Sequence, residues 1–164
     1  MRSSQAAETG LYILVYTSRA RRYVPAVRSF RNILACSQMR NEQVGITGAL
    51  LSFADMFLQT LEGSRSAVQE TFGRICHDTR HHSVRVLWEG HAACRQFSGW
   101  SMCGEHVDAP GASVISELER LAGFGQSQAA SPQAENPLRV MESFQTLHIR
   151  PALDIVGDSD VVYL

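Results

Sequence analysis

The chain has 164 residues, of which 45% are hydrophobic and 19% are charged, as is typical of a globular domain with an ordinary core. Its formal net charge of -1 argues against a general nucleic-acid binder, and no apolar run is long enough to span a membrane. The four cysteines are widely spaced without a CxxC pair, so we expect a reduced, cytoplasmic protein without a signal peptide.

The N-terminal third of the chain predicts a strand followed by a helix. Residues 11–18 (LYILVYTS) are rich in aliphatic and aromatic side chains, as in a buried strand. Pro25 lies near the start of a helix that runs to about Asn41, because apolar residues recur there at helical spacing. An arginine cluster near this junction is either a solvated surface or an anion site for a phosphate group or the acidic C-terminal tail. The cluster comprises Arg19, Arg21, Arg22, Arg28 and Arg31.

The middle of the chain predicts a hairpin, a second helix and two further strands. Gly45 and Gly48 frame a turn into a strand over residues 47–53, and the letters ADM reverse the chain into a strand that carries Gln59. Ser64 is a suitable N-cap for the helix that follows. Residues 83–91 (SVRVLWEGH) alternate as a fourth strand, and a last short strand is expected around residues 100–103.

The resulting order is β-α-β-β-α-β-β, which usually builds a ferredoxin-like α+β fold. In this fold one five-stranded mixed sheet carries both helices on a single face. The pattern loosens beyond residue 104, so we assign residues 1–104 to one domain and residues 105–164 to a C-terminal helical extension and tail. The extension is expected to contain a short helix at 113–122, a linker rich in Gly, Gln, Ser, Ala and Pro at 123–137, and an amphipathic helix after it.

The strand that contains Gln59 places an amide among apolar residues. Side chains alternate along a strand, so Phe57, Gln59 and Leu61 share one face. The opposite face carries Glu62 and looks more solvated, so we expect Gln59 to point into the core. An unpaired buried amide costs about 1–3 kcal/mol, and Gln59 therefore needs hydrogen-bond partners.

Further polar or distinctive residues lie on elements that look buried. Each has an ordinary structural explanation, such as a core phenol bonded to a backbone carbonyl or an amide at a helix end. Taken together, they predict a cavity between the two helices and the sheet that suits a planar heteroaromatic ligand with carbonyl and ring-nitrogen edges. These residues are Tyr16, Ser37, Asn41, Gln59, Arg80, Trp100 and Met102.

Conventional enzyme and metal signatures are missing from the sequence. There is no GxSxG motif and no P-loop, and GFGQSQ lacks the third glycine of a dinucleotide-binding turn. His77 and His81 are four residues apart and would clamp zinc only if the second helix continued that far. No second ligand pair with suitable spacing follows, so we expect no metal site.

Five blocks of the sequence resemble, in order, those of BLUF domains, the blue-light sensors that use FAD. The blocks are LVYTSRA, CSQMRNEQVGITGALL, MFLQTLEG, VQETFGRICHDTRHHSV and RQFSGWSM, and they extend over about residues 11–104. Two departures are modest. Arg40 stands where many members carry a small polar residue or His, and the FADM turn lacks the more usual glycine.

The resemblance implies a site for FAD, with FMN or riboflavin as possible replacements, between the two helices and above the sheet. Tyr16 matches the light-active tyrosine of the family, and Gln59 matches the glutamine between that tyrosine and the flavin N5/O4 edge. Asn41 matches the asparagine that holds the pyrimidine edge of the ring, and Ser37 matches the helix-one serine near the same network.

The resemblance assigns four further residues. Arg80, with His81 beside it, matches the basic pair that contacts the ring or the ribityl side. Trp100 and Met102 match the Trp/Met pair that exchanges places near the glutamine. We therefore expect Tyr16, Gln59, Trp100 and Met102 to take part in the photochemistry or in its transmission.

The resemblance also implies photochemistry without turnover of a substrate. Light would drive electron transfer and then proton transfer from Tyr16 to the flavin through Gln59, and recombination would leave Gln59 rotated or tautomerised. A stronger hydrogen bond to flavin O4 then shifts the absorption to the red. No output catalytic domain is expected in residues 105–164, so the signal would pass to a downstream protein in trans or through a homo-oligomer. No membrane and no direct nucleic-acid partner is expected.

Two alternatives remain open at this point. The chain could be a BLUF relative that no longer holds flavin and serves as an interaction module. The same element order also serves small enzymes such as acylphosphatases, which need a catalytic Arg/Asn pair in a phosphate-binding loop. The stretch VYTSRARR supplies the arginine but no suitable asparagine beside it.

Overall fold

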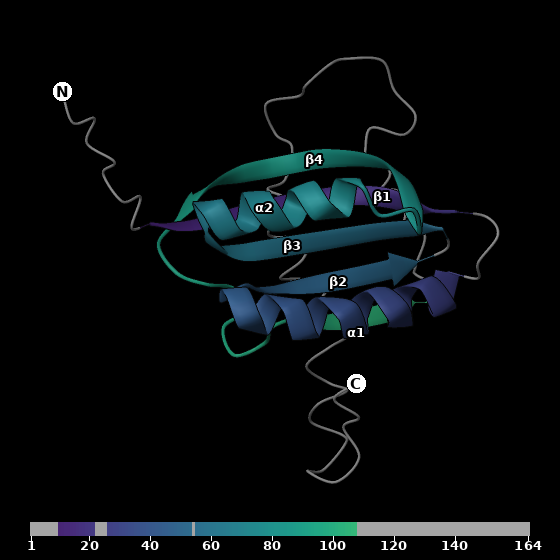
Figure 1. The fold of residues 1–164 in the computed structure, drawn as a ribbon, viewed down its shortest axis with the longest axis horizontal. Helices are drawn as coiled ribbons and strands as arrows, with labels where there is room; N and C mark the ends of the chain where they lie inside the picture. Colours follow the sequence, from purple (N-terminus) through teal and green to yellow (C-terminus); the bar gives the residue numbers. More distant parts are fainter. Residues whose placement is uncertain (1–9, 22–25, 54, 108–164) are drawn as a thin grey trace, which may run out of the picture.

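The structure is a computed structural model that describes residues 10–21, 26–53 and 55–107. Figure 1 shows the elements in the order expected from the sequence, β-α-β-β-α-β-β. Helix α1 continues a little beyond its predicted end at Asn41. The elements are β1 (Leu11–Ala20), α1 (Ala26–Val44), β2 (Thr47–Phe53), β3 (Met56–Ser64), α2 (Arg65–Cys76), β4 (His81–Ala92) and β5 (Cys103–Val107).

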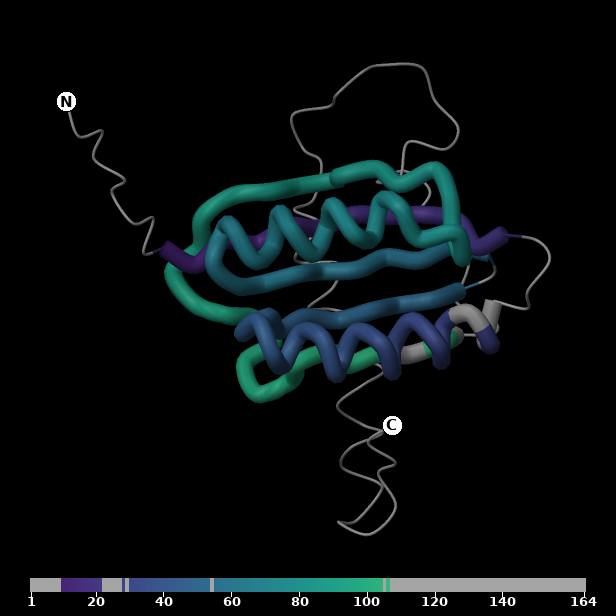
Figure 2. The backbone as a smooth tube through the Cα atoms, in the orientation of Figure 1, coloured from purple at the N-terminus to yellow at the C-terminus, as the bar shows by residue number. Residues whose placement is uncertain are grey.

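The five strands form one mixed sheet in the order β4-β1-β3-β2-β5. Strand β3 lies at the centre and pairs antiparallel with β1 and β2, whereas β5 runs parallel to β2 at one edge. Both helices lie on the same face of the sheet, α2 over β1 and β3 and α1 over the β2 side (Figure 1). The predicted ferredoxin-like arrangement is therefore confirmed. Figure 2 shows the chain running from β4 past the end of the sheet to reach β5 beside α1.

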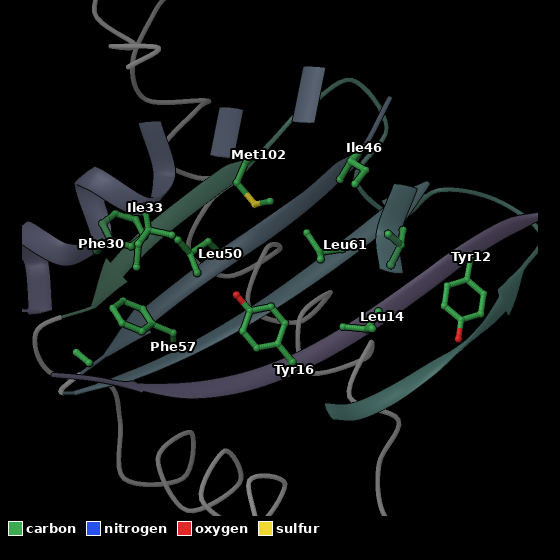
Figure 3. Packing of buried hydrophobic residues seen from close by; sticks show 12 residues of the cluster. Tyr12, Leu14, Tyr16, Phe30, Ile33, Ile46, Leu50, Phe57, Leu61 and Met102 are labelled. Atoms are coloured by element: carbon green, nitrogen blue, oxygen red, sulfur yellow. The ribbon is translucent and has the colours of Figure 1, made fainter. Parts of the chain in front are cut away.

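Alternation along the central strands produces two apolar clusters, one on each face of the sheet. The helix-side cluster, drawn in Figure 3, contains Leu14, Phe30, Leu50, Leu61 and Val68 among others. The far-side cluster is built from residues one position out of phase, which are Ile13, Val15, Leu51, Leu58 and, from the chain between β4 and β5, Phe97. Because both faces carry apolar side chains, β3 is buried along almost its whole length.

Helix α2 begins where the sequence predicts it. The Oγ of Ser64 accepts a hydrogen bond from the backbone N–H of Ala67 and so caps the first turn. Val68 is fully buried on the inner face, and Glu70 pairs with Arg74 on the exposed face at 2.9 Å. The helix ends at Cys76, with His77 as its C-cap. The N-cap serine and the apolar spacing in the sequence were therefore sufficient to predict this helix.

Two expectations about the strands are wrong. Glu62 is 0% exposed, so the second face of β3 is not the wetter one. Its carboxylate is buried because backbone N–H groups and a hydroxyl from other segments pair with it. The last strand begins at Cys103 and not around Trp100, because the chain turns through Gly99, whose φ is +92°, before it pairs with β2.

The C-terminal expectations lie outside the described residues. These are the helix at 113–122, the linker at 123–137 and the amphipathic helix that follows it. Strand β5 ends at Val107, a short distance beyond the expected boundary at residue 104. Neither described helix is long and apolar enough to cross a membrane.

Candidate functional site

A pocket lies on the helix side of the sheet, between α1, α2 and the strands β1 and β3. It encloses about 510 Å³ of space, a figure that includes its open mouth. Six of the eight residues predicted from the sequence line this pocket. They are Tyr16, Ser37, Asn41, Gln59, Arg80 and His81.

Tyr16 and Gln59 face each other on neighbouring strands at the floor of the pocket. The antiparallel register of β1 and β3 places their Cα atoms directly opposite each other, and the Tyr16 hydroxyl donates a hydrogen bond to Gln59 Oε1. Both side chains are almost inaccessible, at 2% and 1% exposed. The partner that the sequence required for the Gln59 amide is therefore the Tyr16 phenol.

The other end of the Gln59 amide contacts Met102. Gln59 Nε2 lies 3.6 Å from Met102 Sδ, and a thioether is only a weak acceptor. Nε2 carries a second hydrogen, and Gln59 lines the pocket. In Figure 3 the Tyr16 hydroxyl and the Met102 side chain both extend into the layer above the strands. The Gln59 amide thus bridges the Tyr16 phenol and the Met102 thioether, and the second N–H of Nε2 is available to a ligand.

The burial of Tyr16 makes its phenol hard to ionise. Removal from water raises the pKa of Tyr16 far above its ordinary value, and the negative charge of Asp78 acts in the same direction. The ring of Phe72 lies against it, with centroids 5.4 Å apart. Tyr16 therefore stays protonated at any ordinary pH in the described site, and it can lose a proton only to a partner that is already in contact with it.

Asn41 connects α1 to the chain between β4 and β5. It is 2% exposed, and its Nδ2 donates to the backbone oxygen of Ser101 at 2.9 Å. One turn earlier, Gln38 Nε2 donates to the backbone oxygen of Met102 at 3.0 Å. An amide has further donor and acceptor positions, so Asn41 can hold a ligand in the pocket while it also fixes Ser101.

The basic residues of the site are arranged by Asp78. Arg80 forms a close ion pair with Asp78 and is half-buried, and its Nη1 lies 3.9 Å from Cys36 Sγ. The hydrogen bonds that the Arg80 side chain donates to the Asp78 carboxylate raise the pKa of Arg80 above its ordinary value. Burial alone would raise the pKa of the Asp78 carboxyl, but the bonds and charge of Arg80 outweigh it and the pKa is lowered. The pair is therefore charged on both sides at neutral pH.

His81 offers the pocket a buried ring nitrogen. It is 6% exposed at the start of β4, and its Nδ1 is buried without a hydrogen-bond partner in the described part of the chain. Burial lowers the pKa of His81, so the ring is held neutral. An unpaired buried ring nitrogen costs free energy unless a bound group completes it. A heteroaromatic ligand with polar edges fits this pocket.

Trp100 does not join the site. It is half-buried and packs against the far-side cluster, on the other face of the sheet from the pocket. Met102 belongs to the helix-side cluster and contacts Gln59, although it does not line the pocket itself. The structure thus brings together seven of the eight predicted residues and leaves Trp100 outside.

Sequence reasoning missed several lining residues. Asp78 is the most important of them, since it holds Arg80, and the close spacing of the two in CHDTRHH was a usable signal. Thr71 is buried on the inner face of α2, one helical turn from Val68 and Ile75, and accepts a bond from Arg74. A threonine among apolar residues at helical spacing gives little warning of a ligand site.

The structure also describes parts of the arginine cluster and of the histidine pair that the sequence singled out. Arg19 of the arginine cluster pairs with Asp55 at 2.8 Å, and Arg22 lies outside the described residues. His77 and His81 do not share a helix, because α2 ends at Cys76 and His81 lies in β4. Among the described residues no group of three or more His, Cys, Asp or Glu side chains could hold a metal ion.

A family profile described as "Sensors of blue-light using FAD" matches residues 11–103 of the chain. The blue light- and temperature-regulated antirepressor BluF of Escherichia coli (strain K12) is 33% identical over 87 residues, which cover 53% of this chain and 21% of that protein. Photoactivated adenylate cyclase subunit alpha of Euglena gracilis is 29% identical over 108 residues, which cover 65% of this chain and 11% of the cyclase subunit. The chain thus spans only a small part of the length of these curated relatives.

Solved structures show a similarity of the same kind. The dark-state structure of BlrB, a BLUF protein, matches with a TM-score of 0.62 and 30% sequence identity. The match covers 82% of this chain and 96% of BlrB.

Proposed function

The chain belongs to the BLUF family of sensors of blue light using FAD, and from this premise we propose that Tyr16 and Gln59 form its light-driven switch. The family assignment gives the class of function and the class of cofactor, which is a flavin. The proposal concerns which residues of this chain hold the flavin and which of them change when light is absorbed. The observation that carries it is the buried contact between Tyr16 and Gln59 at the floor of the pocket.

FAD is the proposed flavin, and six residues are proposed to hold it. Asn41 and Ser37 on α1 suit the polar edge of the ring system, because both line the same wall of the pocket. His81 offers its unpaired Nδ1, and Arg80 offers a guanidinium already oriented by Asp78. Tyr16 and Gln59 complete the floor.

When bound, the flavin supplies the absorption of blue light and a strongly oxidising excited state. The residues around it supply the rest. Tyr16 is the electron and proton donor, and the hydrogen bond to Gln59 Oε1 gives its proton a short route within the described residues. Gln59 then presents the other end of its amide, or the tautomer of that amide, to its neighbours. Burial keeps water from competing for these bonds, so the two arrangements of Gln59 remain distinct.

Purified protein grown with a flavin supply tests this proposal. The spectrum should show a bound flavin in the dark and a red shift after a blue pulse that reverses thermally. Gln59→Leu should keep the flavin and abolish the shift, because leucine has no polar end to exchange. A persistent shift in that variant would overturn the switch. A folded protein that stays colourless after addition of FAD would instead favour a module that no longer binds flavin.

The light-induced change is proposed to be transmitted by the residues that follow β5. The far-side cluster is an apolar sheet face, with both described helices on the opposite side. Two C-terminal helices, a short one at 113–122 and an amphipathic one after the linker, are proposed to cover this face and to respond to light. The chain is proposed to be a cytoplasmic, non-enzymatic sensor. A downstream protein in trans or a second copy of the chain then reads the change. The four free cysteines support a reducing compartment.

A light-dependent measurement of assembly tests the output. Size-exclusion chromatography with light scattering, in the dark and under blue light, should reveal a change in mass or in shape. A light-induced change that persists after removal of residues 108–164 would count against this route. The acylphosphatase-like alternative gains no support from the comparisons and is set aside.

A further inference from the structure

A second buried cluster lies on the face of the sheet opposite the pocket, and its centre is Glu62. This residue lies in β3, three positions after Gln59 and on the other face, and it is 0% exposed. A carboxylate loses several kcal/mol of hydration when it is buried, unless hydrogen bonds replace the water. The neighbours of Glu62 show where those bonds come from.

Three donors converge on the Glu62 carboxylate. Oε1 accepts from the backbone N–H of Gln96 at 2.8 Å, and Oε2 accepts from the backbone N–H of Phe97 at 3.1 Å. Oε2 also accepts from the Thr47 hydroxyl at 2.9 Å. Two of the three donors belong to the chain between β4 and β5, so the carboxylate ties that chain to the centre of the sheet.

Arg95 strengthens the same junction from its more exposed side. Its Nη1 donates to Thr47 Oγ1 and to the backbone oxygen of Glu62, both at 2.8 Å. Its Nη2 donates to the backbone oxygen of Gly45 at 2.9 Å. We call Glu62, Thr47 and Arg95, with the Gln96 and Phe97 amides, the Glu62 clamp.

The clamp lies a few residues before the methionine that contacts the switch. Phe97 is buried in the far-side cluster, and the backbone oxygens of Trp100 and Ser101 accept bonds from Gly48 and Asn41. Met102 follows directly, with its sulfur at Gln59 Nε2. The backbone that leads to that sulfur is therefore held by the clamp at residues 96 and 97, by bonds from Gly48, Asn41 and Gln38 at residues 100–102, and by β5 beyond them.

We propose that Glu62 is a positioning residue for the photoreceptor. It fixes the chain from residue 95 to residue 102 so that the Met102 sulfur stays in contact with Gln59 Nε2. A change in the orientation of the Gln59 amide then changes the conformation of this segment. When Gln59 presents its amide oxygen in place of N–H, the Met102 sulfur loses its donor. Because the clamp holds the preceding residues, the adjustment must occur between Phe97 and Met102. This role rests on the proposed function through the Gln59–Met102 contact.

Glu62→Gln is the informative substitution. It keeps the volume and one acceptor oxygen, but its NH₂ group cannot accept from a backbone N–H, so one of the two amides loses its partner. Glu89→Gln is the matched control, because it removes the same charge from an exposed position on β4. Neither residue lines the pocket.

Amide hydrogen exchange on the full flavin-loaded chain gives the first readout. In the dark, the peptide that contains Gln96 and Phe97 should exchange about tenfold or more faster in Glu62→Gln than in wild type or Glu89→Gln, as expected for the loss of a hydrogen bond to a charged group. This measurement does not depend on any photocycle. Equal exchange in Glu62→Gln and Glu89→Gln would overturn the clamp.

Flash absorption gives the second readout. Glu62→Gln should still bind flavin and show the red shift, but thermal recovery should slow by about threefold to tenfold, because the dark arrangement loses a well-placed acceptor for Gln59. The light-induced change in exchange of residues 98–102 should also shrink. Recovery unchanged from wild type would reject the positioning role. Absence of any red shift in wild type would instead reject the proposed switch and leave the dark-exchange result standing.

A second variant covers the case in which Glu62→Gln does not fold. Arg95→Met keeps the buried carboxylate and removes the three bonds from the exposed side of the clamp. It should raise the exchange of the same peptide by about threefold or more. Unchanged exchange in this folded variant would likewise overturn the proposal.

Discussion

Trp100 and Met102 are separated by a single residue, yet their side chains pack on opposite faces of the sheet. Met102 belongs to the helix-side cluster and contacts Gln59, whereas Trp100 packs against the far-side cluster. The Ser101 carbonyl between them is held by Asn41. In this arrangement the methionine, and not the tryptophan, is the neighbour of the proposed switch.

Met102→Leu should therefore alter the photocycle more than Trp100→Phe does. Leucine fills a similar volume but removes the sulfur that accepts from Gln59 Nε2. We expect Met102→Leu to keep the red shift and to slow thermal recovery by about twofold to tenfold, the kinetic equivalent of one modest hydrogen bond. Trp100→Phe should recover within a factor of about two of wild type. Flash absorption measures both rates, and a larger effect from Trp100→Phe would contradict the assignment.

Tyr16→Phe should abolish the light-induced red shift while the protein still binds flavin. The change removes the hydroxyl and leaves Gln59 Oε1 buried without its donor, which should also lower the free energy of unfolding by about 1–3 kcal/mol. Steady-state difference spectra and urea unfolding provide the two measurements.

Tyr12→Phe is the control for that experiment. Tyr12 lies on the same strand and in the same cluster, but it does not line the pocket. Its substitution should leave the shift intact. A shift that survives in Tyr16→Phe would exclude this phenol as the donor.

Gly48→Ala should be strongly destabilising. A Cβ at this position would lie 2.0 Å from the backbone oxygen of Thr60, so β2 would have to move away from β3. Overpacking of this kind costs about 1–3 kcal/mol. Gly73→Ala is the opposite case, because nothing lies within 4 Å of its Cβ and an alanine inside an exposed stretch of helix adds about 0.5–1 kcal/mol. Urea unfolding should show a lower free energy of unfolding than wild type for Gly48→Ala and a higher one for Gly73→Ala. Changes of the same sign in both variants would contradict this account of the packing.

The protein should lose stability on mild acidification because of His81. Burial lowers the pKa of His81 in the folded state, whereas in the unfolded chain it titrates near its ordinary value of about 6.5. The unfolded state then binds more protons, so the contribution of His81 is complete above about pH 6.5 and declines as the pH falls toward the folded pKa. Asp78, Arg80 and His82 are the charged neighbours that modify this window.

Thermal unfolding of wild type, His81→Gln and the exposed control His82→Gln, between about pH 8 and pH 5.5, checks the expected slope. Removal of His81 should flatten the loss of stability below about pH 6.5 relative to the other two proteins. Parallel curves for all three would show that another group is responsible.

Most of the fold could be predicted from local patterns in the sequence. Ser64 and the apolar face of α2 marked that helix, and the alternation in β3 placed Gln59 on the correct face. The prediction for Glu62 was wrong because its burial depends on backbone amides of Gln96 and Phe97, which lie more than thirty residues away in the chain. No pattern within a strand reveals such partners.

The site could be predicted only in part for a similar reason. The resemblance named residues one by one, and the structure gathers most of them into one pocket. It did not reveal that Asn41 also holds the Ser101 carbonyl, or that Asp78 orients Arg80. These contacts join segments whose relative placement is decided by the packing of the whole sheet.

The strand order also has a mechanical consequence. Gln59 lies on β3, the middle strand of the five, which is hydrogen-bonded to a neighbour on each side. Met102 lies directly before β5, a short edge strand bonded to β2 alone among the described strands. A force between these two side chains acts on β3, which two neighbouring strands hold, and on β5, which a single described strand holds. The strand order therefore favours movement of the edge strand β5 over movement of the central strand β3.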